Sequence, residues 1–253
     1  MTETIGTIRA LSKSLTLEEI PTFLEQYGED SRAGVIAICK SARKRLDQYE
    51  AECQRTEQMK SYEYEYESLG YVCGIDEVGR GPLAGPVVAG AVILPQNCSI
   101  LYLNDSKQLS KGKREELYDI IQREAVATAI GIVSPERIDA INILQATYEA
   151  MRQAITQLSV VPDVLLNDAV TIPEVTIQQV PIIKGDGKSV SIAAASIIAK
   201  VTRDRIMEEY DQSMPEYGFA SNKGYGSASH IEALRAIGPS KIHRKTFIQS
   251  FCS

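Results

Sequence analysis

Apolar and polar residues follow two different patterns along the chain, and the pattern changes near residue 70. Residues 31–69 contain no proline, a single glycine and many Glu, Lys, Arg, Gln and Ala residues, which favour helix. From Gly70 onwards, short apolar runs rich in β-branched residues are separated by turn residues, which is typical of strands. The change predicts a helical N-terminal extension over residues 1–68 and a second domain over residues 69–253.

The second domain is predicted to contain both strands and helices. The expected strands are residues 72–78, 86–94, 125–133, 164–167 and 177–183. The expected helices are a segment capped by Ser110, the region from Ser134 to about Leu158 with a break near Asn142, residues 189–210 and residues 231–237. Three strands followed by alternating helices and strands predict an α/β fold, with a mixed β-sheet flanked by helices.

The N-terminal extension gives fewer signals. Thr16 and Glu19 have the spacing of a capping box, although Pro21 predicts either a kink or a later helix start. The polar run 57–67, in which three tyrosines alternate with acids, predicts a helix end or a linker. Two roles stay open for the extension: a helical appendage that adds stability, or a module that binds a substrate or partner.

Four carboxylates fall at the ends of predicted elements: Asp76, Glu77, Asp168 and Asp186. Burying an unpaired carboxylate costs several kcal/mol, so a cation or hydrogen bonds must compensate. Acids delivered by different strands can meet at one edge of a sheet and hold two divalent ions, which would activate water for phosphodiester hydrolysis. Taken singly, each acid is better explained as an exposed strand end or a turn residue, and only the matching stretches around the acids favour a shared site.

Composition limits which metal the protein is expected to bind and where in the cell it is expected. The five cysteines are widely spaced, and neither they nor the two histidines have the spacing of a zinc site, so carboxylates favour Mg²⁺ or Mn²⁺. No apolar run approaches the roughly 18 residues of a membrane span, and no signal peptide is evident, which predicts a cytosolic, cytoplasmic protein with no membrane contact. The net charge of −6 argues weakly against nucleic acid, but residues 181–253 carry 10 Lys and Arg against 7 Asp and Glu.

Several stretches between residues 70 and 250 resemble one enzyme family, the bacterial type II ribonucleases H (ribonuclease HII). They are the acid pair followed by Gly79-Arg80-Gly81, the segment Asn104-Asp105-Ser106-Lys107, Lys184-Gly185-Asp186, the run from Ser191 to Asp204, Lys223-Gly224-Tyr225-Gly226, and the tail His243-Arg244-Lys245-Thr246-Phe247. The resemblance implies a ribonuclease H-like fold. It also implies that Asp76, Glu77, Asp168 and Asp186 form the catalytic, metal-binding set.

The activity that this resemblance implies is a metal-dependent endonuclease. The family hydrolyses the RNA strand of RNA–DNA hybrids and nicks duplex DNA on the 5′ side of an embedded ribonucleotide, leaving a 3′-hydroxyl and a 5′-phosphate. RNA primer removal in DNA replication and ribonucleotide excision in DNA repair are the implied roles. The expected partners are therefore RNA–DNA hybrids and ribonucleotide-containing duplex DNA, and we expect a monomer.

Recognition must use the 2′-hydroxyl, which distinguishes RNA from DNA. The backbone of Gly79, Arg80 and Gly81 can approach it closely because the two glycines carry no side chain. Tyr225 could stack on the adjoining deoxyribose, and a packed loop aromatic is the alternative.

Three lysines are candidates for phosphate contacts, and surface solvation is the alternative for each: Lys107, Lys184 and Lys200. Neither histidine is needed as a base if metals activate water. His230 is expected to cap or pack, and His243, in a basic tail, to contact phosphate or solvent.

Two other functions compete with this hypothesis. One is the sister ribonuclease HIII, which shares the acid pair and fold; Arg80 argues against it. The other is a non-catalytic nucleic-acid-binding module, and the presence of four acids argues against that, because carboxylates without cations hinder the binding of a polyanion.

Overall fold

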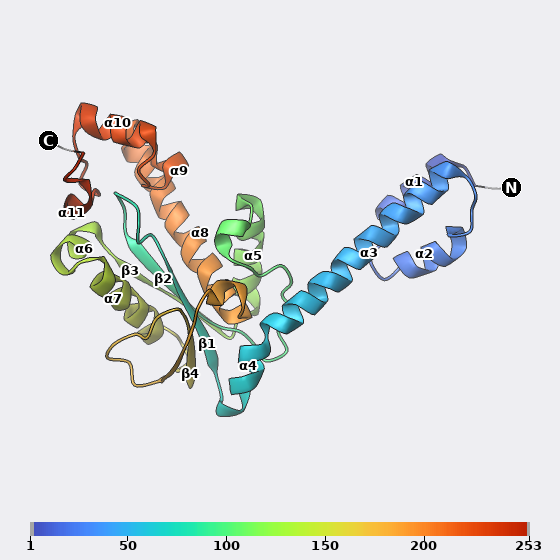
Figure 1. The fold of residues 1–253 in the computed structure, drawn as a ribbon, viewed down its shortest axis with the longest axis horizontal. Coiled ribbons are helices and arrows are strands. Elements are labelled where there is room, and N and C mark those ends of the chain that lie inside the picture. Colours follow the sequence, from blue (N-terminus) through green and yellow to red (C-terminus); the bar gives the residue numbers. More distant parts are fainter. Residues whose placement is uncertain (1–2, 252–253) are drawn as a thin grey trace. The chain divides into compact units, whose positions relative to one another are not determined.

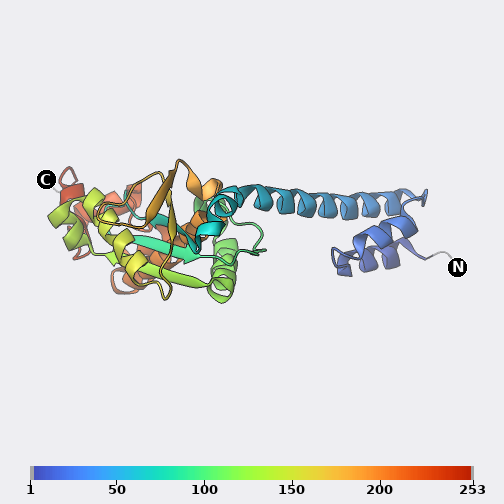
Figure 2. The same ribbon diagram turned by 90° about the horizontal axis from the view of Figure 1, so that it is seen from below.

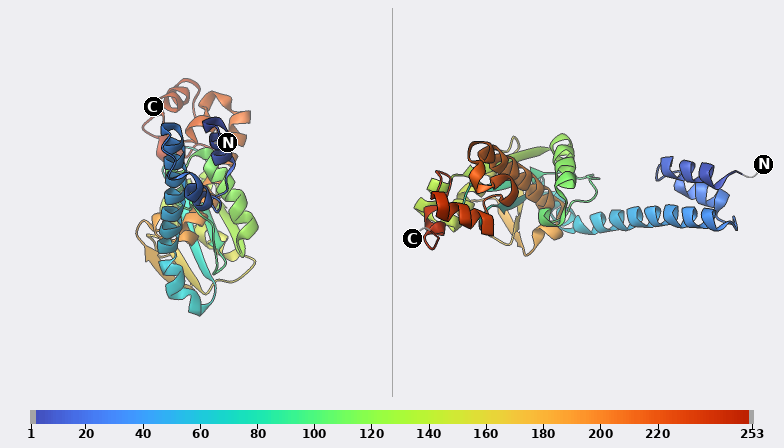
Figure 3. Two further views of the ribbon diagram at one scale, coloured as in Figure 1. Left: turned by 90° about the vertical axis from the view of Figure 1, so that its right-hand side faces the viewer. Right: turned by 90° about the horizontal axis from the view of Figure 1, so that it is seen from above.

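The computed structural model describes residues 3–251 and divides the chain into two compact units, residues 1–57 and 58–253. The first unit consists of α1 (Ile5–Ser14), α2 (Ile20–Tyr27) and most of α3 (Ala33–Met59), as Figure 3 shows. Apolar side chains such as Ile8, Phe23 and Val35 form its small core. The backbone N–H of Thr16 donates to the Glu19 carboxylate at 2.7 Å and α2 starts only at Ile20, so half of the predicted capping box forms.

The second unit is built on a five-stranded mixed sheet (Figure 1). Its strands are β1 (Val72–Val78), β2 (Val87–Ile93), β3 (Ala127–Val133), β4 (Val164–Asp168) and β5 (Gln178–Ile182), arranged in the order β3-β2-β1-β4-β5. The pairs β1–β2 and β2–β3 are antiparallel, and the pairs β1–β4 and β4–β5 are parallel. The predicted strands and the mixed α/β sheet are confirmed.

Helices and short turns connect the strands. The helices are α4 (Ser61–Tyr66), α5 (Lys111–Glu124), α6 (Pro135–Ile141), α7 (Ile143–Thr156), α8 (Val190–Ser213), α9 (Phe219–Asn222), α10 (Ala228–Ile237) and α11 (Lys245–Ile248). As predicted, the Ser110 hydroxyl caps α5, and Asn142 separates α6 from α7. The polar run 57–67 is more ordered than a linker, because α4 places Tyr62 and Tyr66 against an apolar cluster.

The sheet has a helix layer on each face (Figure 1), and Figure 2 shows the same layers from below. One cluster joins β1, β2 and β3 to α7, through residues such as Ile75, Ala91 and Met151. The other joins the opposite face to α5 and α8, through residues such as Val92, Leu117 and Ala194. Strand side chains alternate between these two faces, so the sheet is buried on both sides.

Three glycines allow the helices to approach the sheet closely. A Cβ atom on Gly74 would overlap the backbone of Ser191, and one on Gly90 would overlap the Ala195 carbonyl oxygen, both on α8. On the other face, a Cβ on Gly131 would overlap backbone atoms of Ala150 in α7. Within residues 3–251, no helix is long and apolar enough to cross a membrane.

We predict that Gly90→Ala destabilises the protein by about 1–3 kcal/mol, because the added methyl pushes α8 away from β2. Chemical denaturation at neutral pH measures the free energy of unfolding. Gly112→Ala is the matched control, since no atom lies within 4 Å of its added methyl and alanine favours helix. Equal stability of the two variants would contradict the close contact between α8 and the sheet.

Candidate active site

The predicted acids meet where two parallel strands end. Residue Ile75 of β1 pairs with Asn167 of β4, so Asp76, near the end of β1, lies beside Asp168, the last residue of β4. The Gly185 N–H donates to the Asp168 carboxylate at 2.8 Å, which holds the short 3-10 turn Gly185–Gly187 beside β4. That turn carries Asp186. Segments far apart in the sequence therefore bring the acids to one edge of the sheet.

Burial and repulsion from neighbouring carboxylates disfavour the charged form of three of these acids, Asp76, Glu77 and Asp186. Asp76 is only 6% exposed, and its pKa is well above the usual value because of burial and the nearby Glu77, an effect that a hydrogen bond from Ser196 opposes. Burial also raises the pKa of Glu77, although the Arg80 guanidinium opposes the shift at 3.3 Å. The pKa of Asp186 is raised by burial and then by Asp105 and Asp168. The carboxyl groups at this edge of the sheet therefore cannot all ionise readily without a compensating cation.

This donor set fits a hard divalent cation. Mg²⁺ and Mn²⁺ prefer carboxylate oxygen ligands, and a cation relieves the repulsion that raises these pKa values. Within residues 3–251, no three His, Cys, Asp or Glu side chains already lie close enough together to hold an ion. The four predicted acids are the ones that could turn towards one.

Lys107 is a second cation near these acids, besides Arg80. Burial lowers its pKa, but Asp105, Asp76 and Asp186 outweigh that effect and raise the pKa overall. Asp105 also accepts a hydrogen bond from the Lys107 N–H at 2.9 Å, which starts a short 3-10 turn. No role was predicted for Asp105 from the sequence, although the segment Asn104-Asp105-Ser106-Lys107 was among the matching stretches.

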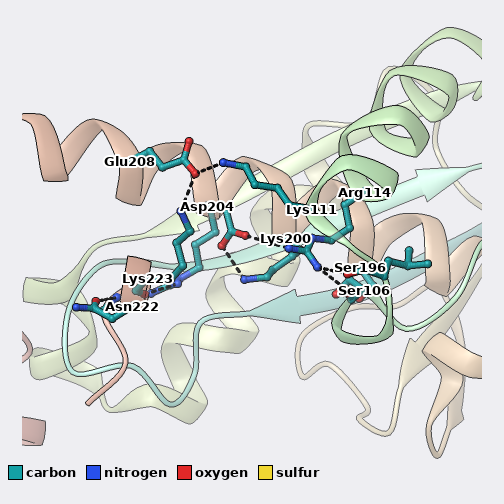
Figure 4. Close-up of polar contacts among 12 residues, drawn as sticks. Ser106, Lys111, Arg114, Ser196, Lys200, Asp204, Glu208, Asn222 and Lys223 are labelled. Carbon is teal, nitrogen blue, oxygen red and sulfur yellow. Dashed lines mark hydrogen bonds and ion pairs between the residues drawn. The ribbon is translucent and has the colours of Figure 1, made fainter. Parts of the chain in front are cut away.

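Two buried serines hydrogen-bond to each other, and one of them contacts Asp76. The Ser196 hydroxyl, on α8, hydrogen-bonds to Asp76 and lies 3.0 Å from the Ser106 hydroxyl (Figure 4). From the sequence, Ser196 was identified only as part of a matching stretch. The position of Ser196 in the sequence does not predict this contact. The side of α8 that faces Asp76 depends on how the helix crosses the sheet.

The other two candidate lysines differ in their surroundings. The Lys200 ammonium is 2.7 Å from the Asp204 carboxylate (Figure 4), and burial lowers its pKa although Asp204 opposes the shift. Lys184 is exposed, in a left-handed backbone conformation just before Gly185. Figure 4 also shows Lys111 and Lys223 sharing the Glu208 carboxylate beside this pair.

The turn after β1 lies against the Tyr225 loop, as a recognition site would require. A Cβ atom on Gly81 would be 3.8 Å from the Tyr225 ring, which is 45% exposed. The two segments are joined where the Leu83 N–H donates to the Gly224 carbonyl at 2.8 Å. Gly79 has φ +90°, a conformation that favours glycine.

The expectation that His243 contacts phosphate or solvent is wrong. It is 3% exposed, and its Nε2 lies 2.9 Å from Nε2 of the fully buried His230. His243 Nδ1 accepts from the Ser240 N–H, so its proton is on Nε2 and is donated to His230. His230 then donates from Nδ1 to the Tyr225 carbonyl at 2.8 Å. Two neutral histidines therefore fix the backbone beneath the exposed tyrosine.

A cavity of about 560 Å³ lies elsewhere in the second unit. It is bordered by the start of β1, the end of β2 and α4, and residues such as Tyr64, Tyr71 and Leu94 line it. None of the predicted site residues lines this cavity. The candidate active site is therefore the edge of the sheet where the acids lie.

The comparisons with known proteins agree on one family. A family model described as Ribonuclease HII matches residues 73–250, and one described as Ribonuclease HII N-terminal domain matches residues 4–67. The Ribonuclease HII of Lachnoclostridium phytofermentans is 62% identical over 229 residues, which are 90% of each chain.

Solved structures give the same fold. The ribonuclease H2 of Pyrococcus horikoshii is 30% identical with a TM-score of 0.59, and the match covers 70% of this chain and 93% of that one. Bst-RNase HIII in complex with Mn²⁺ has a TM-score of 0.55 at 19% identity, covering 70% of this chain and 67% of that one, which shows a shared fold.

We predict that the histidine pair makes stability depend on pH. Burial and then the neighbouring His230 lower the pKa of His243 to about 4 from a usual 6.5. The unfolded chain thus binds the proton more readily, so stability is complete above pH 6.5 and falls by on the order of 3 kcal/mol towards pH 4. Urea denaturation across this window should show a smaller pH dependence in His243→Asn. Identical pH dependence in both proteins would contradict the neutral pair.

Proposed function

The chain belongs to the ribonuclease HII family and is a ribonuclease H, and from this premise we propose its reaction and its site. It hydrolyses the RNA strand of RNA–DNA hybrids and nicks duplex DNA 5′ to an embedded ribonucleotide, leaving a 3′-hydroxyl and a 5′-phosphate. The observation that carries the proposal is that Asp76 and Glu77 of β1, whose pKa values burial raises, lie beside Asp168 at the end of β4. Residues 69–253 form the catalytic domain and residues 1–68 a helical extension.

Asp76, Glu77, Asp168 and Asp186 would hold the divalent ions, Mg²⁺ or Mn²⁺. When bound, two such ions supply water activation and stabilisation of the leaving oxygen. Hydrogen bonds within the protein orient two of these acids, since the Glu77 N–H donates to the Asp76 carboxylate at 2.7 Å and the Gly185 N–H donates to Asp168 at 2.8 Å. These hydrogen bonds leave the other carboxylate oxygens to the cations.

The substrate would lie along the turn and the Tyr225 loop. Backbone groups of Gly79, Arg80 and Gly81 contact the 2′-hydroxyl, and the exposed ring of Tyr225 stacks on the neighbouring deoxyribose. Phosphate contacts come from lysine ammonium groups along the same side: Lys107, Lys184 and Lys200. Lys200 would have to exchange its ion pair with Asp204 for the phosphate.

In the cell, these activities would serve RNA primer removal and ribonucleotide excision. We place the protein in the cytoplasm as a monomer.

The reaction is tested with end-labelled duplex DNA that contains one ribonucleotide. The duplex is incubated with Mg²⁺, Mn²⁺ or chelator, beside an RNA–DNA hybrid. A metal-dependent nick 5′ to the ribonucleotide is expected, and cleavage of the hybrid alone would overturn the junction specificity.

We predict that Asp76→Asn and Asp168→Asn each reduce kcat by about 10²–10³-fold or more, because each removes one negative ligand and the charge stabilisation it provides. Both variants should still bind the hybrid, as measured by fluorescence anisotropy. Asp119→Asn, an exposed acid on α5, is the matched control and should cleave normally. Unchanged turnover in both active-site variants would rule out these ligands.

We predict that Tyr225→Ala lowers kcat/KM for duplex DNA with one ribonucleotide by roughly 5- to 150-fold. The physical reason is that stacking on an aromatic ring is worth about 1–3 kcal/mol. Tyr225→Phe keeps the ring and should retain most activity. Tyr71 is also 45% exposed but borders the separate cavity, so Tyr71→Ala is the control. A loss of equal size in Tyr71→Ala would contradict a specific role for Tyr225.

A further inference from the structure

Two arginines are completely buried beneath the proposed recognition turn. Arg203, on α8, and Arg244, just before α11, are each 0% exposed. In the described part of the chain, neither forms an ion pair with a carboxylate. Arg203 borders Asp204 in sequence, but the Asp204 carboxylate pairs instead with Lys200. Burying a charge without a counterion costs free energy, so other interactions must compensate for it.

Arg244 uses its guanidinium to bind carbonyl oxygens of the turn. Its Nη2 donates to Gly79 at 2.5 Å and to Gly85 at 2.9 Å, its Nε donates to Gly85 at 3.0 Å, and its Nη1 donates to Arg80 at 2.9 Å. The planar guanidinium presents several donors in a fixed fork, so one side chain holds three peptide groups at once.

Arg203 joins the same turn to the Tyr225 loop. Its Nε donates to Pro86 at 2.9 Å, its Nη2 to Ala84 at 3.1 Å, and its Nη1 to Lys223 at 2.9 Å, in each case at the carbonyl oxygen. A Cβ atom on Gly79 would overlap this side chain, so the glycine is required for the contact. Arg203 therefore sets the spacing between the turn and the loop.

These hydrogen bonds to carbonyl oxygens determine the direction in which the backbone N–H groups of the turn point. In a trans peptide the C=O and the N–H lie on opposite sides. The Gly79 and Arg80 carbonyls point inward to Arg244, so the following amides, those of Arg80 and Gly81, point outward. Within residues 3–251, neither amide has an acceptor. Two adjacent outward N–H groups form a nest that suits a phosphate or hydroxyl oxygen.

We propose that Arg203 and Arg244 are positioning residues for ribonucleotide recognition. Arg244 aims the Arg80 and Gly81 amides at the nucleic acid, and Arg203 holds them at a fixed distance from Tyr225. Burial lowers the pKa of Arg203 to about 10 and that of Arg244 to about 9, which still leaves both charged at neutral pH. The inference rests on the proposed function and deepens it.

Arg244→Lys tests the proposal by steady-state kinetics on duplex DNA with one ribonucleotide. A lysine keeps a cation but cannot hold three carbonyls, so KM should rise about tenfold while kcat changes less than twofold. A merely structural role would lower the active fraction and hence kcat, with KM unchanged, and that result would overturn the proposal. Arg205→Lys, an exposed arginine paired with Glu115, is the control and should leave both constants unchanged.

Arg203→Lys should likewise raise KM, because the loop is no longer tied to the turn.

A second measurement uses the wild-type protein and does not depend on whether the variants fold. In metal-free ¹⁵N spectra, the Arg80 and Gly81 amide signals should shift with the ribonucleotide duplex and less with the all-DNA duplex. Equal shifts, or none, would overturn the proposal. Failure of the wild type to nick its substrate would instead refute the proposed function.

Discussion

The close approach of α8 to the sheet is the constraint on which the site depends. Gly74 and Gly90 leave room for its backbone, and a side chain at either position would lift the helix. Ser196 and Arg203 are seven residues apart, which is two helical turns and about 10.5 Å along the axis, so they share one face. That face supports Asp76 at one point and the recognition turn at the other. One packing contact therefore fixes both parts of the site.

Acidic and basic groups lie close together around the turn that follows β1. The acids at the ends of β1 and β4 repel one another, and two buried guanidiniums lie under the turn that follows β1, with neutral carbonyls as their partners. The net charge of −6 therefore says little about this surface. In the proposed reaction, a phosphodiester accompanied by divalent cations would supply the charge that each group lacks.

The sequence predicted the fold well because its signals are local. Apolar runs indicated the five strands, and the Ser110 cap and the Asn142 break were visible in single residues. The four acids were selected by the same kind of signal, since each falls at or near the end of a predicted element. Local signals do not predict long-range contacts: His243 in a basic tail looked exposed, yet it is buried against His230, thirteen residues earlier.

The same limit explains the arginines and Asp105. A buried Arg203 looks like any helix-face arginine, because its partners, Ala84 and Pro86, lie more than 100 residues away. Family resemblance helped by marking the stretches that contain these residues, but it gave them no role. Their contacts depend on how α8 and the C-terminal tail cross the turn, and that geometry is set by packing.

In the proposed function, catalysis and recognition use different chemical groups. The acids act through side chains, so substituting an acid removes its oxygen ligands. The turn acts through backbone amides, which every residue except proline has, so replacing the Arg80 side chain leaves the amide in place. The side chains that control this part of the site are the ones that orient the backbone. The proposal therefore places the greatest sensitivity of recognition at Arg203 and Arg244, two buried residues that bind carbonyl oxygens of the turn.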